Sequence, residues 1–563
     1  MKRFILFLFV GIVCVSCVNE LEDIRVDNEI EEPCLNDLLN LSDGVVIGKK
    51  LRNPYSIEVM KEACDLLYPP TRGETSASDT IIVPNVKYVR FLPADSTEFR
   101  LLMEAGLELF NYPLDYEILG DPNDYRDPSI PPYSIQWQYT VMPIDQAMPI
   151  DNGEILEVGY IPELDMPDTG VDLTDLEQTA IAVVLEGFIN GPVVNPYPTG
   201  GDVSSGGGST SNDTNKPSPT GRITIRDNGS IVGVKSIKIR ARNFFKIITT
   251  YTNDDGEYYI NLDDILCPWF ELRFHNKYGF EIGYGAQVIM PMSTFMGFET
   301  NFSCTKASDQ KSWVACTINN AAYDWYSRCI EEGMPTPPND LYIWAIEEFE
   351  GASCPMLHHG VLRESGFTSD LVGCVLFGSE FLNKILGGLE ILIEMVGPDV
   401  TVCDVDNCTT HDIYKYVSHE LAHATHYKQL GSNDVIRSQW WAHVFGYEIQ
   451  CMLNSNFQEV YEHPSVPREE RAGITEMWAH AVGHICGYEH RQKQKQPYPH
   501  TNQYWFAPEI LIDLYDGGMT LKQICDCMTS DVVTLEGFRA RLIANNSSYA
   551  QRINNLFNKY LDN

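Results

Sequence analysis

Residues 417–430 read VSHELAHATHYKQL and carry His419, Glu420 and His423 in the pattern H-E-x-x-H. The apolar residues of this stretch recur at helical spacing, which predicts one continuous helix. Residues four apart on a helix point to the same side, so the two imidazoles can reach a single Zn²⁺ ion. Glu420 lies beside that position, where its carboxylate can take a proton from a water molecule. The motif therefore predicts a hydrolytic metal centre.

The residues before the motif predict how this helix is placed. Thr409 and Asp412 stand three apart in the pattern of a capping box, which marks the helix start. Val400–Val402 is a short run of strand-forming residues, and we expect an edge strand along which an extended peptide can pair. The competing interpretation is a chance match to the motif on a surface helix, with both histidines in water.

A catalytic zinc site takes three protein ligands and leaves the fourth position to water. His426 follows His423 by three residues, but one continuous helix does not easily wrap three ligands around an ion. We therefore expect His426 to pack beside the site. Glu448 and Glu476 lie on later predicted helices, on faces lined by apolar or small residues. A buried carboxylate is costly there unless something pairs with it, and a metal ion would do so. Spacing alone leaves both glutamates open as the third ligand.

Two strings in this region, HELAHATHY at 419–427 and ITEMWAHAVGH at 474–484, resemble the gluzincin class of zinc metallopeptidases. Gluzincins complete H-E-x-x-H with a glutamate on a downstream helix. The resemblance thus implies a zincin-like α+β catalytic domain, with Glu476 as the third zinc ligand and Glu448 as the alternative. The strings also look like those of Bacteroidetes surface lipoproteins of this kind.

Gluzincins place a tyrosine or histidine after the third ligand, where it stabilises the oxyanion. The candidates in this chain are His480, His484, Tyr488 and Tyr498. The resemblance favours Tyr488 as this catalytic donor. His480 follows Glu476 by four residues on the same helical face, and we expect it, like His426, to contact a metal ligand.

The first residues resemble a lipoprotein signal peptide, which we assign to residues 1–17. A basic start is followed by the apolar run Phe4–Val15, which is too short to span a bilayer, and then by Ser16 and Cys17. The pattern resembles the bacterial lipobox and implies a lipid on Cys17, with the chain anchored in the outer membrane, at the cell surface or on its periplasmic side. The alternative is an ordinary cleaved signal.

The rest of the chain divides by composition into four parts. Residues 195–220 are rich in Gly, Ser and Pro and predict a flexible linker. The preceding region, 18–194, mixes strand and helix patterns and is expected to be an α+β accessory region. Residues 221–283 alternate with period two around Asp/Asn-Gly turns, which predicts a small β-sandwich. This stretch resembles the transthyretin-like, carboxypeptidase regulatory-like domain. Residues 284–563 are expected to be the zinc peptidase domain.

Helical spacing dominates that last part. The segments that we expect to be helices are Asn319–Glu332, Asp412–Leu430, Gln439–Leu453, Ile474–Tyr488 and Glu509–Met528. The predicted fold class is therefore multidomain, with an α+β accessory region, a small β-sandwich and a mainly α-helical, zincin-like α+β catalytic domain.

The charge is strongly negative, with 40 Lys+Arg against 78 Asp+Glu and a net of −38. Nucleic-acid-binding surfaces need a basic footprint, so we expect no nucleic-acid partner. Residues 18–194 hold 34 acidic and 10 basic side chains, a net of 10 − 34 = −24. Most of the acidity therefore belongs to the accessory region and says little about the substrate of the metal site.

These features predict a zinc-dependent peptidase on a bacterial surface lipoprotein. Its substrate would be a protein or peptide, and Glu420 would act as the general base. The alternative function is that of a non-catalytic surface adhesin, or a lipoprotein that binds glycans or proteins, whose zincin domain is degenerate.

Overall fold

The computed structural model describes residues 47–561 with gaps. The longer stretches outside the described residues are 1–46, 70–77, 163–170, 190–217, 285–290, 346–351, 360–397, 455–466 and 491–503. The predicted signal peptide with Cys17 and most of the predicted linker therefore lie outside the described residues.

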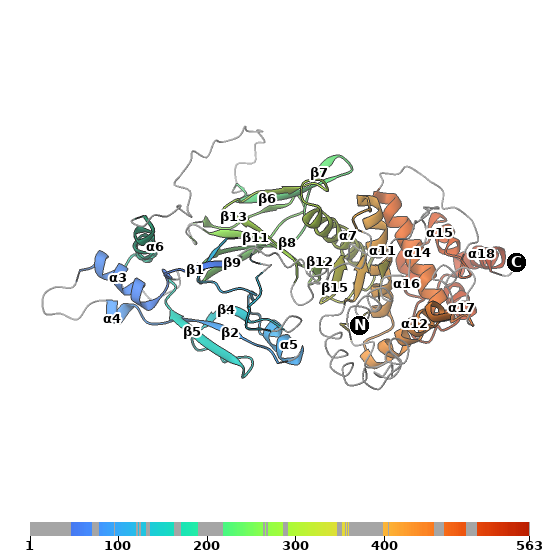
Figure 1. The fold of residues 1–563 in the computed structure, drawn as a ribbon. Helices are drawn as coiled ribbons and strands as arrows, with labels where there is room; N and C mark the ends of the chain where they lie inside the picture. The colour runs from blue at the N-terminus through green and yellow to red at the C-terminus, as the bar shows by residue number, and fades with distance from the viewer. Residues whose placement is uncertain are drawn as a thin grey trace, which may run out of the picture.

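The described residues form a mixed α/β structure of several β-sheets and helices (Figure 1). This confirms the coarse prediction of an α+β chain. Among these residues, none of the helices combines the length and the apolar character that crossing a membrane requires.

The accessory region contains a three-stranded antiparallel sheet with the order β4-β2-β5 and a separate two-stranded sheet. Its central strand, β2, alternates in sequence, and its side chains Tyr88, Val89 and Phe91 are buried. The elements of this region are β1 (Ile47–Lys50), α3 (Ile57–Leu67), α4 (Ser78–Ile81), β2 (Val86–Phe91), α5 (Ser96–Glu104), β3 (Tyr116–Ile118), β4 (Gln138–Pro143), β5 (Gly153–Gly159) and α6 (Leu173–Ile189).

Two further sheets pack on each other after the linker. In the smaller sheet, β6 pairs with β7, β10 and β14; the larger has the order β16-β17-β15-β12-β11-β8-β9, with β13 also paired to β11. Their strands are β6 (Gly221–Asp227), β7 (Ser230–Gly233), β8 (Ile237–Asn243), β9 (Lys246–Tyr251), β10 (Glu257–Tyr258), β11 (Trp269–Asn276), β12 (Glu281–Tyr284), β13 (Ser293–Gly297), β14 (Phe302–Cys304), β15 (Tyr342–Ala345), β16 (Ala352–Ser353) and β17 (Val400–Val402). Ile223 and Ile225 of β6 share one buried core with Ile237 and Ile239 of β8, as the period-two pattern implies.

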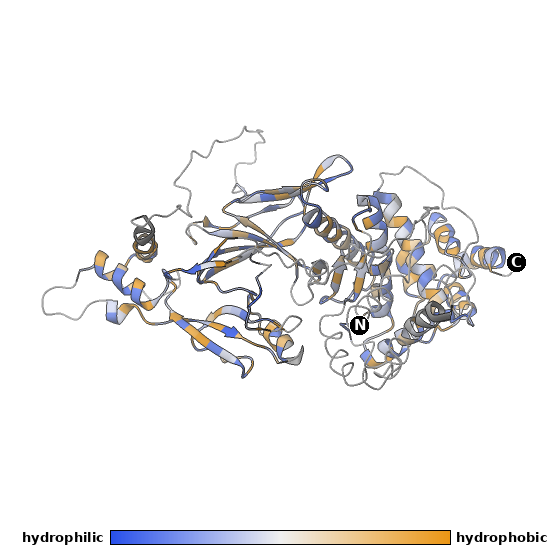
Figure 2. Ribbon diagram, viewed as in Figure 1, coloured by the Kyte–Doolittle hydropathy of each residue, from blue (hydrophilic) through white to orange (hydrophobic). Residues whose placement is uncertain are grey.

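The larger sheet continues from the predicted sandwich into the strands that precede the H-E-x-x-H helix. β12 pairs in parallel with β15, and β15 pairs in parallel with β17. The predicted boundary at residue 283 therefore falls inside β12, and the parts on either side of it share one sheet and one core. Figure 2 shows hydrophobic residues along the strands and helices of this part of the molecule.

Val400–Val402 is a strand, as predicted, but the prediction that it is an edge strand is wrong. Ala352 and Ser353 of β16 pair with Val402 and Thr401 on the side away from β15. The sequence did not reveal β16 because a strand of two residues has no periodicity to detect.

The helices of the C-terminal part are α7 (Gln310–Glu332), α11 (Thr410–Gln429), α12 (Asp434–Asn454), α14 (Glu470–His490), α15 (Glu509–Asp516), α16 (Leu521–Cys525), α17 (Leu535–Asn545) and α18 (Ala550–Tyr560). The first four confirm predicted helices. The prediction of a single helix over Glu509–Met528 is wrong, because Gly517 and Gly518 separate α15 from α16. Gly518 has a φ of 94°, a value that a right-handed helix cannot contain.

The accessory region packs on the β8–β9 end of the larger sheet. Phe244 and Phe245, between these strands, belong to the accessory core, and Lys246 pairs with Glu177 at 2.8 Å. The H-E-x-x-H helix α11 contacts the other end of the sheet, at β16 and β17, and packs between α7 and α14 (Figure 1). The accessory region and the metal-site helices thus lie at opposite ends of this sheet.

Candidate metal centre

Helix α11 begins as the sequence predicts. The Thr409 hydroxyl accepts a hydrogen bond from Asp412 N at 3.3 Å, and Thr409 N donates to Asp412 Oδ2 at 2.8 Å, which completes a capping box. The capping box fixes where the helix begins, and packing of α11 against α7, α14, β16 and β17 buries His419, Glu420 and His423. The competing interpretation of a surface helix with exposed histidines is therefore wrong.

Helix α14 approaches α11 closely because small residues line its facing side. A Cβ on Gly483 would lie 3.1 Å from His419 Cβ and 3.1 Å from Lys415 O, so glycine is what the available space allows. Trp478 Nε1 donates to Ala422 O at 3.0 Å across the same contact. These contacts hold Glu476 of α14 against the two histidines of α11.

The two histidines and Glu476 bring their donor atoms together. His419 Nε2 lies 3.2 Å from His423 Nε2, and the Glu476 carboxylate lies 3.3 Å from His423 Nε2 and 3.6 Å from His419 Nε2. Ligands about 2.0–2.1 Å from a tetrahedral zinc ion are separated by about 3.3–3.4 Å. The two imidazole nitrogens and Glu476 Oε1 approach this spacing around His423, while the other carboxylate oxygen, Oε2, faces His419. Two imidazoles and a carboxylate are a donor set that can bind a metal ion such as zinc.

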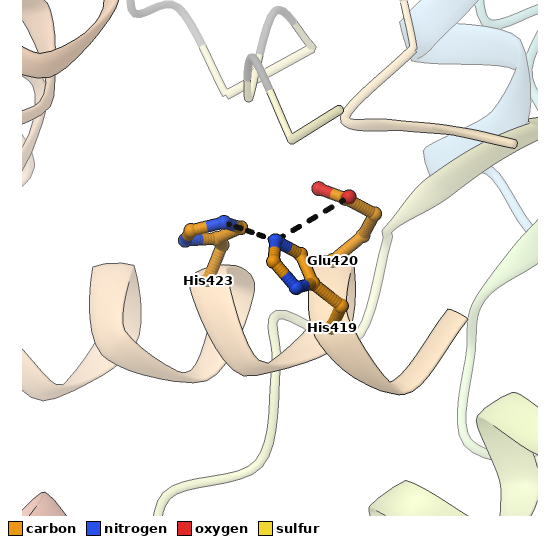
Figure 3. A group of neighbouring side chains, drawn as sticks. All are labelled: His419, Glu420 and His423. Atoms are coloured by element: carbon orange, nitrogen blue, oxygen red, sulfur yellow. Dashed lines mark hydrogen bonds and ion pairs between the residues drawn. The ribbon is translucent and has the colours of Figure 1, made fainter. Parts of the chain in front are cut away.

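Glu420 lies next to these donors, on the same side of α11 (Figure 3). Its Oε1 is 3.9 Å from His419 Nε2, farther than the spacing among the three donors, and the side chain is fully buried. His419, Glu420 and His423 together have ligand atoms close enough to hold a metal ion. The longer separation places the Glu420 carboxylate beside the predicted ion, where it can accept a proton.

Burial sets the protonation states of this cluster. It lowers the pKa of His419 to about 4, with a further contribution from His423. Burial alone would raise the pKa of Glu476, but the facing His423 and His419 outweigh it and hold this pKa below its usual range. Around neutral pH His419 is therefore a neutral imidazole and Glu476 a carboxylate, which are the forms that bind a metal ion.

His426 does not join the donor atoms. Its Nδ1 lies 3.1 Å from the hydroxyl of Thr475, and its ring packs edge-on against Trp440 and Trp441. Burial lowers the pKa of His426 to about 3. This placement is the one expected for a residue that packs beside the site.

His480 lies beside both Glu476 and His419, and these three residues also have ligand atoms close enough to hold a metal ion. Its Nε2 is 3.6 Å from Glu476 Oε2, and its ring stands perpendicular to that of His419 at 4.7 Å. Tyr504 and Phe506 flank the ring at 4.8 and 5.5 Å. Burial lowers the pKa of His480, so its imidazole is neutral.

The side chains of Glu448 and Tyr488 lie outside the described residues, although both backbones are part of helices, α12 and α14. Tyr488 follows Glu476 by 488 − 476 = 12 residues on α14. At about 1.5 Å per residue its backbone lies about 18 Å farther along the helix axis.

Thr475 is the site residue that the sequence reasoning missed. Its hydroxyl lies 2.9 Å from His423 Nδ1, and its side chain is fully buried. Imidazole ligands of zinc commonly hydrogen-bond through their second nitrogen. A hydroxyl directly before the predicted ligand Glu476 could therefore have been proposed as such a partner.

No family model, curated protein or solved structure matches this chain.

Proposed function

We propose that the chain is a zinc-dependent peptidase in which His419, His423 and Glu476 hold the metal ion. The observation that supports this proposal is that two imidazole nitrogens, 3.2 Å apart, converge on the Glu476 carboxylate, whose Oε1 lies 3.3 Å from His423 Nε2 and whose Oε2 lies 3.6 Å from His419 Nε2. The first two separations are close to the edge of a tetrahedral zinc site. Three protein ligands leave a coordination position for water, as in catalytic rather than structural zinc sites.

The zinc ion and Glu420 have different roles in the proposed hydrolysis. When bound, zinc supplies Lewis-acid polarisation of the scissile carbonyl and lowers the pKa of a water molecule. Glu420 accepts a proton from the attacking water and then delivers it to the leaving amine. Burial keeps bulk water away from this carboxylate, which strengthens its interactions with the reacting groups.

We assign the hydrogen bond to the developing oxyanion to His480 rather than to Tyr488. The imidazole of His480 is at the site, 3.6 Å from Glu476, and its neutral form carries one N–H donor. The backbone of Tyr488 is about 18 Å away along α14, which exceeds the reach of a tyrosine side chain.

The wider context of the proposal comes from the sequence. The gluzincin-like strings and the lipobox-like Cys17 support a zincin-like catalytic domain on a lipid-anchored bacterial surface protein, with protein or peptide substrates. The sheet strands β16 and β17 beside α11, and β11 and β12 beside α7, provide an α+β frame that suits such a domain.

Glu420→Gln provides the direct test of the mechanism. Digestion of a peptide library by the wild-type chain should stop when zinc is removed by a chelator. Glu420→Gln should keep about one zinc per chain and lose about 10²–10⁴-fold in cleavage rate, the usual share of general acid–base catalysis. Glu536→Gln, an exposed carboxylate on α17, is the matched control and should cleave like wild type.

The outcomes separate the two functions considered. Full activity of Glu420→Gln contradicts the proposed mechanism. Tight zinc binding without cleavage of any library peptide would favour the alternative, a binding or adhesion lipoprotein.

A further inference from the structure

The Thr475 hydroxyl lies between two buried imidazoles. Its Oγ1 is 2.9 Å from His423 Nδ1 and 3.1 Å from His426 Nδ1. His423 is 2% exposed, His426 1% and Thr475 0%, so water does not compete for these hydrogen bonds. The three side chains form a short chain of hydrogen bonds that begins at the donor cluster and ends at His426.

The number of available protons restricts which group donates and which accepts in each of these two hydrogen bonds. A hydroxyl has one proton, so Thr475 can donate to only one of the two nitrogens and must accept from the other. A neutral imidazole carries its proton on either Nδ1 or Nε2. The tautomer of His423 therefore dictates the tautomer of His426.

Metal binding to His423 determines which group donates in each of these hydrogen bonds. With zinc on His423 Nε2, the proton of this ring is on Nδ1 and is donated to Thr475. The Thr475 hydroxyl must then donate to His426 Nδ1, and the proton of His426 resides on Nε2.

Without metal, the carboxylate of Glu476 sets the opposite direction. Its Oε1 lies 3.3 Å from His423 Nε2, and its Oε2 lies 3.6 Å from His419 Nε2, which is itself 3.2 Å from His423 Nε2. A carboxylate only accepts hydrogen bonds, so its two oxygens favour a proton on Nε2 of each ring. His423 Nδ1 then accepts from Thr475, and the Thr475 oxygen accepts from a proton on His426 Nδ1.

We propose that Thr475 and His426 form a relay that positions His423 for zinc and reverses its hydrogen-bond direction when the metal binds. The proposal rests on the zinc site of the proposed function and extends it to two residues that touch no metal. Both are positioning residues, because they act through the ring of His423.

The relay predicts a pattern of zinc affinities. Loss of such a hydrogen bond to a ligand imidazole typically costs about 10–100-fold in metal affinity. Thr475→Val keeps the shape of the side chain but removes the hydroxyl, and should weaken zinc binding by this amount. Thr475→Ser keeps the hydroxyl and should bind within about 3-fold of wild type.

Two variants of His426 refine the test. An asparagine amide oxygen can occupy the place of Nδ1, whereas leucine has no acceptor. His426→Asn should therefore retain more zinc affinity than His426→Leu, although both leave the same ring contacts with Trp440 unfilled. Equal affinities of the two variants would show that His426 acts through packing alone and would overturn its role in the relay.

The decisive experiment is NMR of ¹⁵N-histidine-labelled protein at pH 8, with and without zinc, using His426→Asn to assign the His426 signals. We expect the proton of His426 on Nδ1 without metal and on Nε2 with about one equivalent of zinc. The same tautomer in both states, or wild-type zinc affinity in Thr475→Val, overturns the relay while the zinc site stands. Failure of the wild-type chain to bind zinc at all overturns the proposed function itself.

Discussion

Among the described residues, a buried Arg–Glu cluster in the larger sheet and the buried His–Glu cluster of the metal site differ in the groups that face their carboxylates. In the first, Arg240 of β8 faces Glu271 of β11 in a cross-strand pair, with Nε donating to Glu271 Oε2 at 3.0 Å. Arg240 also lies over the ring of Phe110 of the accessory region at 3.7 Å. In the second, His419, His423 and Glu476 bring three donor atoms to one point.

The two clusters differ in the groups that face the buried carboxylate. Burial raises the pKa of Glu271, but Arg240 and Arg273 outweigh it and keep this pKa below its usual value. The chain thus supplies its own cations to this carboxylate. In the metal cluster, the carboxylate of Glu476 instead faces the imidazoles of His419 and His423, and we expect a bound cation to complete it. A buried carboxylate that faces two imidazoles is therefore a better indicator of a metal site than burial alone.

The largest expected effect comes from breaking the first cluster. Arg240→Met leaves Glu271 buried without its main partner and should lower the free energy of unfolding by about 3–5 kcal/mol. Denaturant titration should give the same loss with and without zinc. Arg226→Met, at an exposed position on β6, is the control and should unfold like wild type. A loss in Arg240→Met that depends on zinc would contradict the separation of the two clusters.

The second cluster should respond to metal instead. Zinc at about a thousand times its dissociation constant should stabilise the wild-type chain by about 4 kcal/mol. His423→Ala should gain no such stabilisation, whereas His443→Ala, an exposed position on α12, should gain as much as wild type. Equal zinc stabilisation of wild type and His423→Ala, seen as a rise in melting temperature, would place the metal elsewhere.

Substitutions at the close contact between α11 and α14 should have a smaller effect on stability and zinc binding. Gly483→Ala brings a methyl group to 3.1 Å from His419 Cβ and should cost about 1–3 kcal/mol and weaken zinc binding. Gly487→Ala strains the same helix pair at His411 and Lys415 but does not touch a ligand. It should reduce stability without changing zinc affinity, as measured by competition with a chelator. Equal zinc affinities of both variants would show that the contact at Gly483 does not position His419.

The smallest effect concerns pH. Burial would lower the pKa of His359, but Asp399 at 2.9 Å and Asp340 at 3.2 Å outweigh it and raise the pKa to about 10. The stability from this raised pKa is fully present below the unfolded pKa of about 6.5 and is lost as the pH rises through about 10. The stability difference between wild type and His359→Gln should therefore shrink over that range. A constant difference would show that the ring is not charged.

The sequence predicted the placement of the motif residues better than the packing around them. The H-E-x-x-H spacing and the capping box place His419, Glu420 and His423 because both are local patterns on one helix. Glu476 could be named only with the help of a resemblance, since its approach to α11 depends on the packing at Gly483, which no local pattern encodes.

The larger errors come from contacts between distant segments. The short strand β16 and the pairing of β12 with β15 join residues far apart in the chain, so periodicity could not reveal that one sheet spans the predicted boundary at 283. The hydroxyl of Thr475 was missed for the same reason, because its two partners lie 52 and 49 residues away.

The most direct test of the proposed metal centre is a crystal structure of the zinc-loaded protein with anomalous scattering at the zinc edge. We expect one peak about 2.0–2.2 Å from His419 Nε2, His423 Nε2 and a carboxylate oxygen of Glu476. A peak bound by Glu448 in place of Glu476, or no peak at these histidines, would contradict it.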